Sequence, residues 1–146
     1  MNDSLPRYWT EPFVDALVAA LNQNPKFQKA ARSFKASVAL RVLDTPDGLD
    51  ATATYTIESG RVVKHTFETW EAGGAMRTLV FDKKQLLART TTSYATWLKL
   101  DRGEINVAQA LVSPDYKIEG SKFKIMRHIG VFTTMGDIAA KLPKRY

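Results

Sequence analysis

The sequence contains no cysteine, only two histidines and no long apolar run. Without cysteine the chain has neither a disulfide framework nor thiolate chemistry, which is typical of a cytoplasmic protein. No apolar stretch approaches the roughly 20 residues that a membrane-spanning helix needs. The opening residues MNDSLPRYWTEP also lack the basic and apolar segments of a secretory signal. We therefore expect a cytoplasmic protein without a membrane span.

The side chains that most enzymes use are scarce as well. Neither His65 nor His128 has a carboxylate or a second histidine at metal-ligand spacing. We expect His65 to be a hydrogen-bonded structural residue on the inner face of a strand, and His128 to lie on the surface. No G-x-S-x-G elbow, P-loop or G-x-G-x-x-G motif is present. The sequence therefore predicts no catalytic site, no metal site and no cofactor.

The charge is uneven along the chain. The 146 residues are 45% hydrophobic and 25% charged, which predicts a single globular domain over residues 1–146. The net charge is +6, and five of these charges belong to the last 27 residues, where Asp137 is the only carboxylate. This asymmetry favours an acidic partner, such as an anionic membrane, nucleic acid or an acidic ligand. A solvated helix face explains the same pattern equally well.

The first part of the chain predicts two helices followed by a sheet. Thr10 and Asn24 are suitable N-caps, and apolar residues recur at helical spacing after each of them. Alternating apolar residues then predict strands over 38–43, 49–57 and 61–70, with Val63 among the inward-facing residues.

Further strands are expected over 76–82 and 86–93. Strands that follow one another through short turns favour an antiparallel meander with helices on one face. The expected fold class is α+β, with a mostly antiparallel sheet of five strands, or six if residues 73–93 supply an extra one.

The stretch YATWLKLDRGEINVAQALVSPDYKIEG predicts two short helices and a strand. Trp97 and Leu98 lie on one helical face, and Gly103 can adopt the left-handed conformation that ends a helix. Asn106 is a suitable N-cap for the second helix. Residues 116–120 alternate as a half-buried strand does. A basic segment and a final apolar helix follow. The stretch contains no nucleophile or metal-ligand cluster, so we predict that it forms the wall of an enclosed space and takes no part in catalysis.

This stretch resembles the sterol carrier protein 2 (SCP-2) sterol-transfer family. The resemblance is carried by the spacing of an aromatic helix, a glycine, a short apolar helix and the strand ending K-I-E-G, and it extends over roughly residues 10–142. The matching residues are Trp97, Leu98, Gly103, Ala110, Leu111, Lys117, Ile118, Glu119 and Gly120.

The resemblance implies a five-stranded sheet, helices on one face and an apolar tunnel between the two layers, without catalytic residues. It implies hydrophobic ligands such as fatty acids, acyl-CoAs or sterol-like lipids, and a tunnel bordered by the helical region 123–142. The chain ends in KRY rather than the peroxisomal S-K-L address, so neither the peroxisome nor sterol itself is supported.

We therefore predict non-catalytic binding or carriage of lipids or other hydrophobic ligands. Large apolar side chains, including adaptable methionines, are expected to line the cavity, although each of them individually suits a packed core. The predicted ligand-binding residues are Trp70, Phe81, Trp97, Leu98, Ile105, Leu111, Phe123, Met126, Phe132 and Met135. The basic C-terminal end is expected to make transient contact with an anionic membrane.

Two alternatives remain open. The threonine-rich strand over 86–93 could form the edge of a protein-interaction domain or of a homodimer. The basic segment 117–127, with Tyr116 and Phe123 available to stack on bases, could bind nucleic acid weakly. No recognised nucleic-acid-binding motif accompanies this segment, which makes nucleic acid the less favoured partner.

Overall fold

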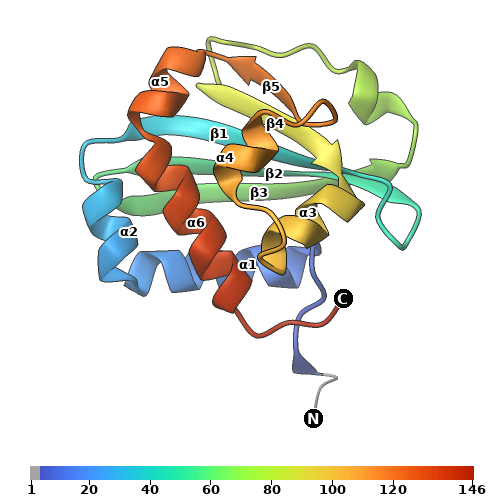
Figure 1. The fold of residues 1–146 in the computed structure, drawn as a ribbon, viewed down its shortest axis with the longest axis horizontal. Coiled ribbons are helices and arrows are strands. Elements are labelled where there is room, and N and C mark those ends of the chain that lie inside the picture. The colour runs from blue at the N-terminus through green and yellow to red at the C-terminus, as the bar shows by residue number, and fades with distance from the viewer. Residues whose placement is uncertain (1–3) are drawn as a thin grey trace.

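A computed structural model describes residues 4–146 as an α+β fold in which helices cover one face of a five-stranded sheet (Figure 1). The helices are α1 Glu11–Gln23, α2 Pro25–Ala30, α3 Tyr94–Asp101, α4 Val107–Leu111, α5 Lys122–Arg127 and α6 Ile129–Lys141, with a 3-10 helix, η2, at Ala75–Thr78. The strands are β1 Lys35–Leu43, β2 Leu49–Glu58, β3 Arg61–Glu71, β4 Ala88–Ser93 and β5 Lys117–Gly120, in the sheet order β3-β2-β1-β4-β5. None of the helices within residues 4–146 is long and apolar enough to cross a membrane.

The predicted N-terminal helical pair is confirmed. Thr10 precedes α1, and the Asn24 side chain accepts hydrogen bonds from the backbone N–H groups of Lys26 (2.9 Å) and Phe27 (3.2 Å) at the start of α2. These bonds satisfy backbone donors that have no partner inside a helix. The apolar stripe of α1, including Leu17 and Leu21, is buried. Helix α1 therefore packs with this stripe against β3 and the neighbouring helices α2 and α6.

Strands β1, β2 and β3 form the expected antiparallel meander. The register pairs Leu40 with Ala53, and successive side chains alternate between the helix-covered face and the opposite face. A register shift at Thr56/Ile57 changes the predicted alternation in β3. As a result Val62 is buried and Val63 is 54% exposed, so the prediction that Val63 faces inward is wrong.

The prediction of a meander beyond β3 is also wrong. Strand β4 pairs with β1 in parallel, which requires residues 72–87 to cross from one edge of the sheet to its other half. Residues 75–78 form η2 rather than a strand, and there is no sixth strand in the part of the chain that the structure describes. We call the sheet face opposite the helices the crossover face, because this connection lies against it.

Long-range polar contacts hold the crossover in place. The buried Asp50 carboxylate accepts hydrogen bonds from Gly73 N (3.1 Å) and Arg77 Nε (2.8 Å), and Arg41 Nη1 donates to the carbonyl of the buried Met76 (2.9 Å). Burial alone would raise the pKa of Asp50, but the hydrogen bonds from Arg77 and the backbone more than offset it and lower that pKa. The crossover thus depends on partners distant in sequence.

Glycine is required at the end of β5. Gly120 has φ +114°, and a Cβ there would lie 2.3 Å from the carbonyl oxygen of Leu87. This close approach lets β5 pair with β4, with Glu119 opposite Arg89 on the crossover face. Arg89 donates to both carboxylate oxygens of Glu119, at 2.9 and 3.0 Å. The glycine of the K-I-E-G segment is therefore a packing requirement of the edge strand.

Asp115 connects β4, α3 and the loop before β5. Its carboxylate accepts hydrogen bonds from the hydroxyls of Thr96 (2.5 Å), Thr92 (3.2 Å) and Ser113. The bonds from Ser113 and Thr96 lower the pKa of Asp115 from 3.8 to about 2. A carboxylate with a lowered folded-state pKa stabilises the fold above its unfolded pKa, and this contribution is lost as the pH falls.

We predict that the free energy of unfolding decreases between about pH 4 and pH 2. Asp115→Asn should remove about 1 kcal/mol of stability at neutral pH and reduce this acid dependence, the small size reflecting solvent screening of an exposed carboxylate. Chemical denaturation across this pH range measures both effects. The control is Glu68→Gln, which neutralises an exposed carboxylate on β3. An identical acid dependence in the wild type and Asp115→Asn would contradict the prediction.

Candidate functional site

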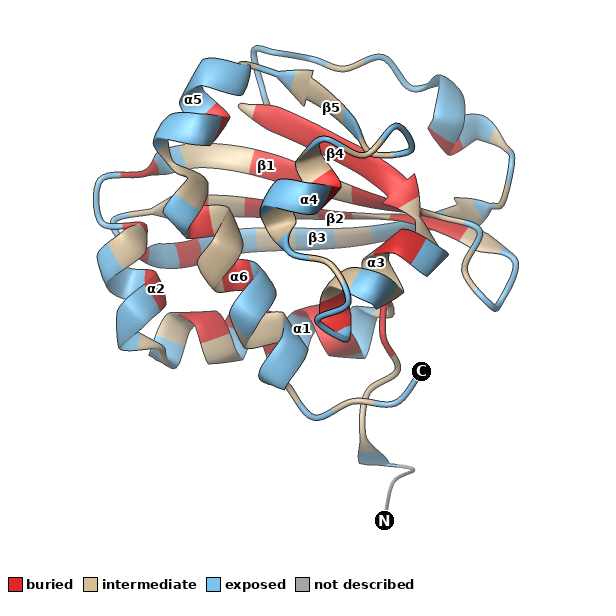
Figure 2. Ribbon diagram, in the orientation of Figure 1, coloured by how far each residue is buried: buried red, intermediate tan, exposed pale blue. Residues whose placement is uncertain are grey.

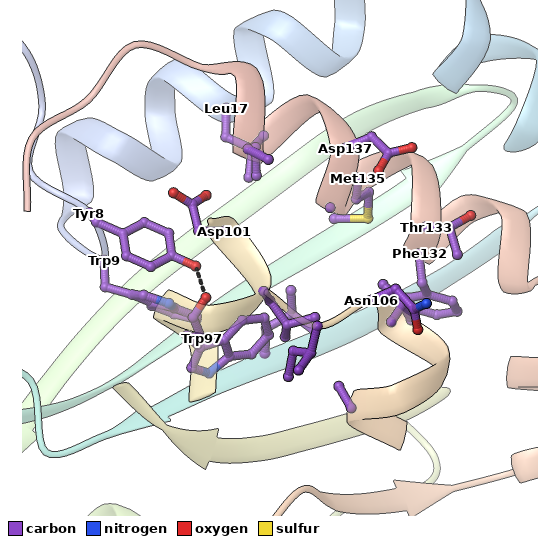
Figure 3. A pocket seen from close by; sticks show the side chains of 18 of the residues that line it. Tyr8, Trp9, Leu17, Trp97, Asp101, Asn106, Phe132, Thr133, Met135 and Asp137 are labelled. Carbon is purple, nitrogen blue, oxygen red and sulfur yellow. Dashed lines mark hydrogen bonds between the residues drawn. The ribbon is translucent and has the colours of Figure 1, made fainter. Parts of the chain in front are cut away.

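A cavity of about 420 Å³ lies between the helices and the sheet (Figure 3). Leu40 of β1 and Tyr55 of β2 contribute its sheet side. The remaining lining comes from the N-terminal segment, α1, α3, α4, α6 and the α3–α4 connection, together with Tyr116 just before β5. The side chains from α1 are Phe13, Val14 and Leu17. The parallel β1–β4 pairing contributes to this arrangement, because the crossover passes over the other face of the sheet and leaves the helix side unfilled.

Three aromatic side chains define one end of the cavity. Tyr8, Trp9 and Trp97 lie together in Figure 3, and the Trp9 and Trp97 rings are 5.1 Å apart between centroids. Trp97 Nε1 donates to the carbonyl of Arg41 (3.0 Å), and the Tyr8 hydroxyl donates to the carbonyl of Trp97 (3.1 Å). Trp9 adopts the left-handed backbone conformation, with φ 59°. These contacts fix the rings, so this end of the cavity is preformed.

The opposite side of the cavity reaches the surface between α6 and the α3–α4 connection. Asn106, Gly136 and Asp137 all line the cavity and are exposed. The Asn106 side chain is held by a capping box, in which Gln109 N donates to Asn106 Oδ1 and Asn106 N donates to Gln109 Oε1, both at 2.8 Å. In Figure 3, Asn106, Thr133 and Asp137 lie on the side of the site away from Tyr8 and Trp9. The opening thus has a polar rim, whereas the interior is mostly apolar.

The phenol groups along the cavity stay uncharged at neutral pH. Burial raises the pKa of Tyr55, of Tyr116 and of Tyr8, where the nearby Asp101 carboxylate raises it further. No group in residues 4–146 forms a hydrogen bond with the Tyr55 hydroxyl. The cavity therefore presents neutral aromatic surface with an unused polar group on its sheet side.

One buried ion pair borders the aromatic end. Lys144 Nζ donates to Asp101 Oδ2 (3.0 Å), and the two side chains are 4% and 1% exposed. The Tyr146 hydroxyl donates to the same oxygen (2.6 Å), whereas Asp101 Oδ1 has no hydrogen-bond partner in residues 4–146. The C-terminal segment also pairs with the N-terminal segment through Arg145 N and the carbonyl of Pro6 (3.0 Å). Lys144 is thus buried in an ion pair. It is therefore not available to an acidic partner, although in sequence it belongs to the basic C-terminal region.

Comparisons with known proteins identify the fold but give no sequence relative. No protein-family model matches the chain, and no curated protein matches it in sequence. A crystal structure of sterol carrier protein 2 superposes with a TM-score of 0.73 at 16% identity, covering 93% of this chain and 99% of the other. The chain has the SCP-2-like fold.

Two other solved structures support the same fold. The solution structure of a conserved hypothetical protein from Thermus thermophilus has a TM-score of 0.70 at 15% identity and covers 94% of this chain and 91% of its own. Apo sterol carrier protein 2 from Yarrowia lipolytica has a TM-score of 0.55 at 10% identity and covers 97% and 99%. The fold that the resemblance implied and the expected fold class are thereby confirmed.

The SCP-2-like fold brings together four of the ten predicted ligand-binding residues. Trp97, Ile105, Phe132 and Met135 line the cavity. The other six lie outside it. Leu98 packs against the hydrophobic core beside the cavity, and Leu111 is half-buried at the end of α4.

The remaining four predicted residues lie elsewhere because of strand alternation, the path of the crossover or the orientation of α5. Trp70 pairs with Asp50 and so belongs to the crossover face, where Phe81 lies 5.7 Å from the guanidinium of Arg89. Because Ile125 is the buried residue of α5, Phe123 and Met126 project outward and are 76% and 58% exposed.

Sequence reasoning missed the contribution of the N-terminus. Neither Tyr8 nor Trp9 is among the predicted ligand-binding residues, yet both are buried and line the cavity. The signal was two adjacent large aromatic residues directly before the helix cap Thr10, a composition that is unusual for an unpacked end.

The expected structural role of His65 agrees with its contact to Asp15 of α1, at 2.8 Å.

We predict that Lys144→Met lowers the free energy of unfolding by about 3 kcal/mol, because it leaves the buried Asp101 carboxylate without its cation. The double variant Asp101→Asn/Lys144→Met should recover most of this loss, since it removes both charges. Chemical denaturation of the three proteins measures the difference. Equal stability of the wild type and Lys144→Met would show that the pair does not hold the C-terminal segment.

Proposed function

We propose that this protein binds and carries hydrophobic ligands without catalysing a reaction. The observation that carries the proposal is the preformed cavity of about 420 Å³, lined mostly by aromatic and aliphatic side chains. Ligand sites in proteins commonly have volumes of roughly 300–1,000 Å³ and a few polar groups at defined positions. The SCP-2-like fold supports the proposal, since the superposed structure with the TM-score of 0.73 is described as a sterol carrier protein.

Apolar burial alone is sufficient for useful affinity in such a cavity. Each buried methylene contributes about 0.8 kcal/mol, so ten methylenes contribute roughly 8 kcal/mol before ordering costs are deducted. The fixed rings of Trp97 and its neighbours reduce those costs, because little of the site must be ordered on binding. A long aliphatic chain or a fused-ring lipid is therefore a suitable occupant.

The charges around the cavity favour an uncharged ligand. No lysine, arginine or histidine is among its described lining residues, whereas Asp101 and Asp137 are. The nearby Lys144 ammonium is already paired with Asp101. Neither a fatty-acid carboxylate nor an acyl-CoA phosphate would find a free cation there, and burying an unpaired charge is unfavourable. A neutral lipid therefore suits the site best, either the expected sterol-like lipid or a long-chain alcohol.

Filling the cavity should abolish uptake without unfolding the protein. Leu17→Trp and Ile105→Trp each add bulk to a lining position, and we predict at least a ten-fold weaker uptake of a fluorescent neutral lipid because the ligand loses its space. The added ring occupies empty volume, so the stability loss should be smaller than the roughly 1–3 kcal/mol of an overpacked core.

The matched control is Phe123→Trp, which adds the same kind of ring outside the cavity. It should leave uptake unchanged. Uptake at the wild-type level in both cavity variants would contradict the proposal. So would a wild-type protein that takes up no lipid and yields no lipid in an organic extract.

A further inference from the structure

Two large apolar side chains of helix α5 face outward. Phe123 and Met126 lie three residues apart, on the side of the helix opposite the buried Ile125. Ser121 Oγ accepts a hydrogen bond from Lys124 N and begins the helix. In Figure 2, α5 is drawn largely in the exposed colour at the upper end of α6. These two side chains are thus held outward by a folded helix.

Three cations surround this apolar pair. Lys122, Lys124 and Arg127 form no ion pair with a carboxylate of residues 4–146. No aspartate or glutamate occurs anywhere between residues 120 and 136. We call these three cations together with Phe123 and Met126 the α5 surface. It combines large apolar groups with uncompensated positive charge.

We propose that the α5 surface docks the protein on an anionic membrane. Phe123 and Met126 enter the boundary between headgroups and acyl chains, while the cations contact acidic headgroups. The purpose of this docking rests on the proposed ligand binding, but docking itself does not require an occupied cavity. Of the basic C-terminal region expected to contact a membrane, α5 is thus the part that makes the contact, whereas the buried Lys144 does not.

The same features argue against a symmetric dimer at this surface. An isologous dimer brings the same patch of both copies together. At the α5 surface that contact would place three unpaired cations of one copy against three of the other. Like charges close together repel each other, and no carboxylate on the helix is available to offset them. An acidic lipid surface supplies both the opposite charge and an apolar layer.

The position of α5 connects docking with the cavity. Helix α6 begins two residues after α5 ends, and its residues Phe132, Met135 and Gly136 line the cavity. A bilayer that contacts α5 therefore lies at the end of a helix that forms part of the enclosure. Figure 1 shows α5 continuing into α6, which passes beside α4 across the front of the sheet.

Vesicle co-sedimentation tests the proposal with two kinds of vesicle, pure phosphatidylcholine and a mixture with phosphatidylserine. We expect binding only to the mixed vesicles, and a decrease with added salt. Lys122→Gln/Lys124→Gln/Arg127→Gln should weaken this binding by about five-fold for each cation removed, which corresponds to about 1 kcal/mol each. Phe123→Ser/Met126→Ser should weaken it at least ten-fold, and its thermal midpoint should stay unchanged because both positions are exposed.

The crossover supplies the matched control, because it also exposes an apolar side chain beside two lysines. Val80 is 89% exposed and precedes Lys83 and Lys84. Val80→Ser/Lys83→Gln/Lys84→Gln should bind vesicles as the wild type does. Loss of binding in this control but not in the α5 variants would overturn the proposal. Equal wild-type binding to both vesicle types would overturn it as well.

Two further measurements separate docking from the other occupants and from ligand binding. Binding of a single-stranded oligonucleotide at physiological salt, without vesicle binding, would overturn the membrane assignment in favour of nucleic acid. Uptake of the fluorescent neutral lipid in solution should be unchanged in Phe123→Ser/Met126→Ser. A failure of docking with intact uptake therefore contradicts only the docking surface, and a failure of uptake with intact docking contradicts only the cavity.

Discussion

The hydrogen bonds of Trp97 hold the helix layer in position relative to the sheet. Its indole N–H donates to the carbonyl of Arg41 on β1, and its own carbonyl accepts the Tyr8 hydroxyl. One residue of α3 thereby links a central strand to the N-terminal segment. These directional contacts hold α3 and the N-terminal segment at a fixed distance from β1. The space between the helices and the sheet is therefore not completely filled by side chains, and a cavity remains beside Trp97.

The two faces of the sheet have different tasks. The crossover face carries the polar contacts of the buried Asp50 and Arg41 and of the more exposed Arg77, which hold the connection that makes β4 parallel to β1. The helix face carries neutral aromatic and aliphatic groups and encloses the cavity. One face of the sheet is therefore stabilised by hydrogen bonds to the crossover, whereas the other face leaves a cavity under the helices. The buried pair of Asp101 and Lys144 attaches the C-terminal segment at the edge of the enclosure.

Local patterns in the sequence predicted the parts of the fold that depend on neighbours along the chain. The N-caps Asn24 and Asn106 are observed with their expected hydrogen bonds, and the alternating segments form the β1–β3 meander. The crossover was not predictable in this way, because Asp50 accepts from Arg77, 27 residues away. Nothing in the periodicity of residues 76–82 indicates that this contact replaces a strand.

The site was predicted in part for a similar reason. Trp97 and Met135 belong to helices whose apolar faces could only turn toward the sheet, and both line the cavity. In α5 the apolar residues occupy two sides, and the single buried Ile125 decides that Phe123 faces outward. The choice between these sides is made by packing, which a single sequence does not display. The same holds for Trp9, whose left-handed backbone brings an N-terminal indole to the cavity.

The central claim is that a hydrophobic ligand enters the cavity between α6 and the sheet, and methionine methyl NMR tests it most directly. Three methionines of the described chain occupy separate environments: Met135 lines the cavity, Met76 is buried on the crossover face and Met126 is exposed on α5. On titration with a long-chain alcohol, the account predicts that the Met135 methyl resonance shifts and shows contacts with ligand methylenes, while Met76 and Met126 keep their positions. An unchanged Met135 resonance, or a shift confined to Met126, would contradict it.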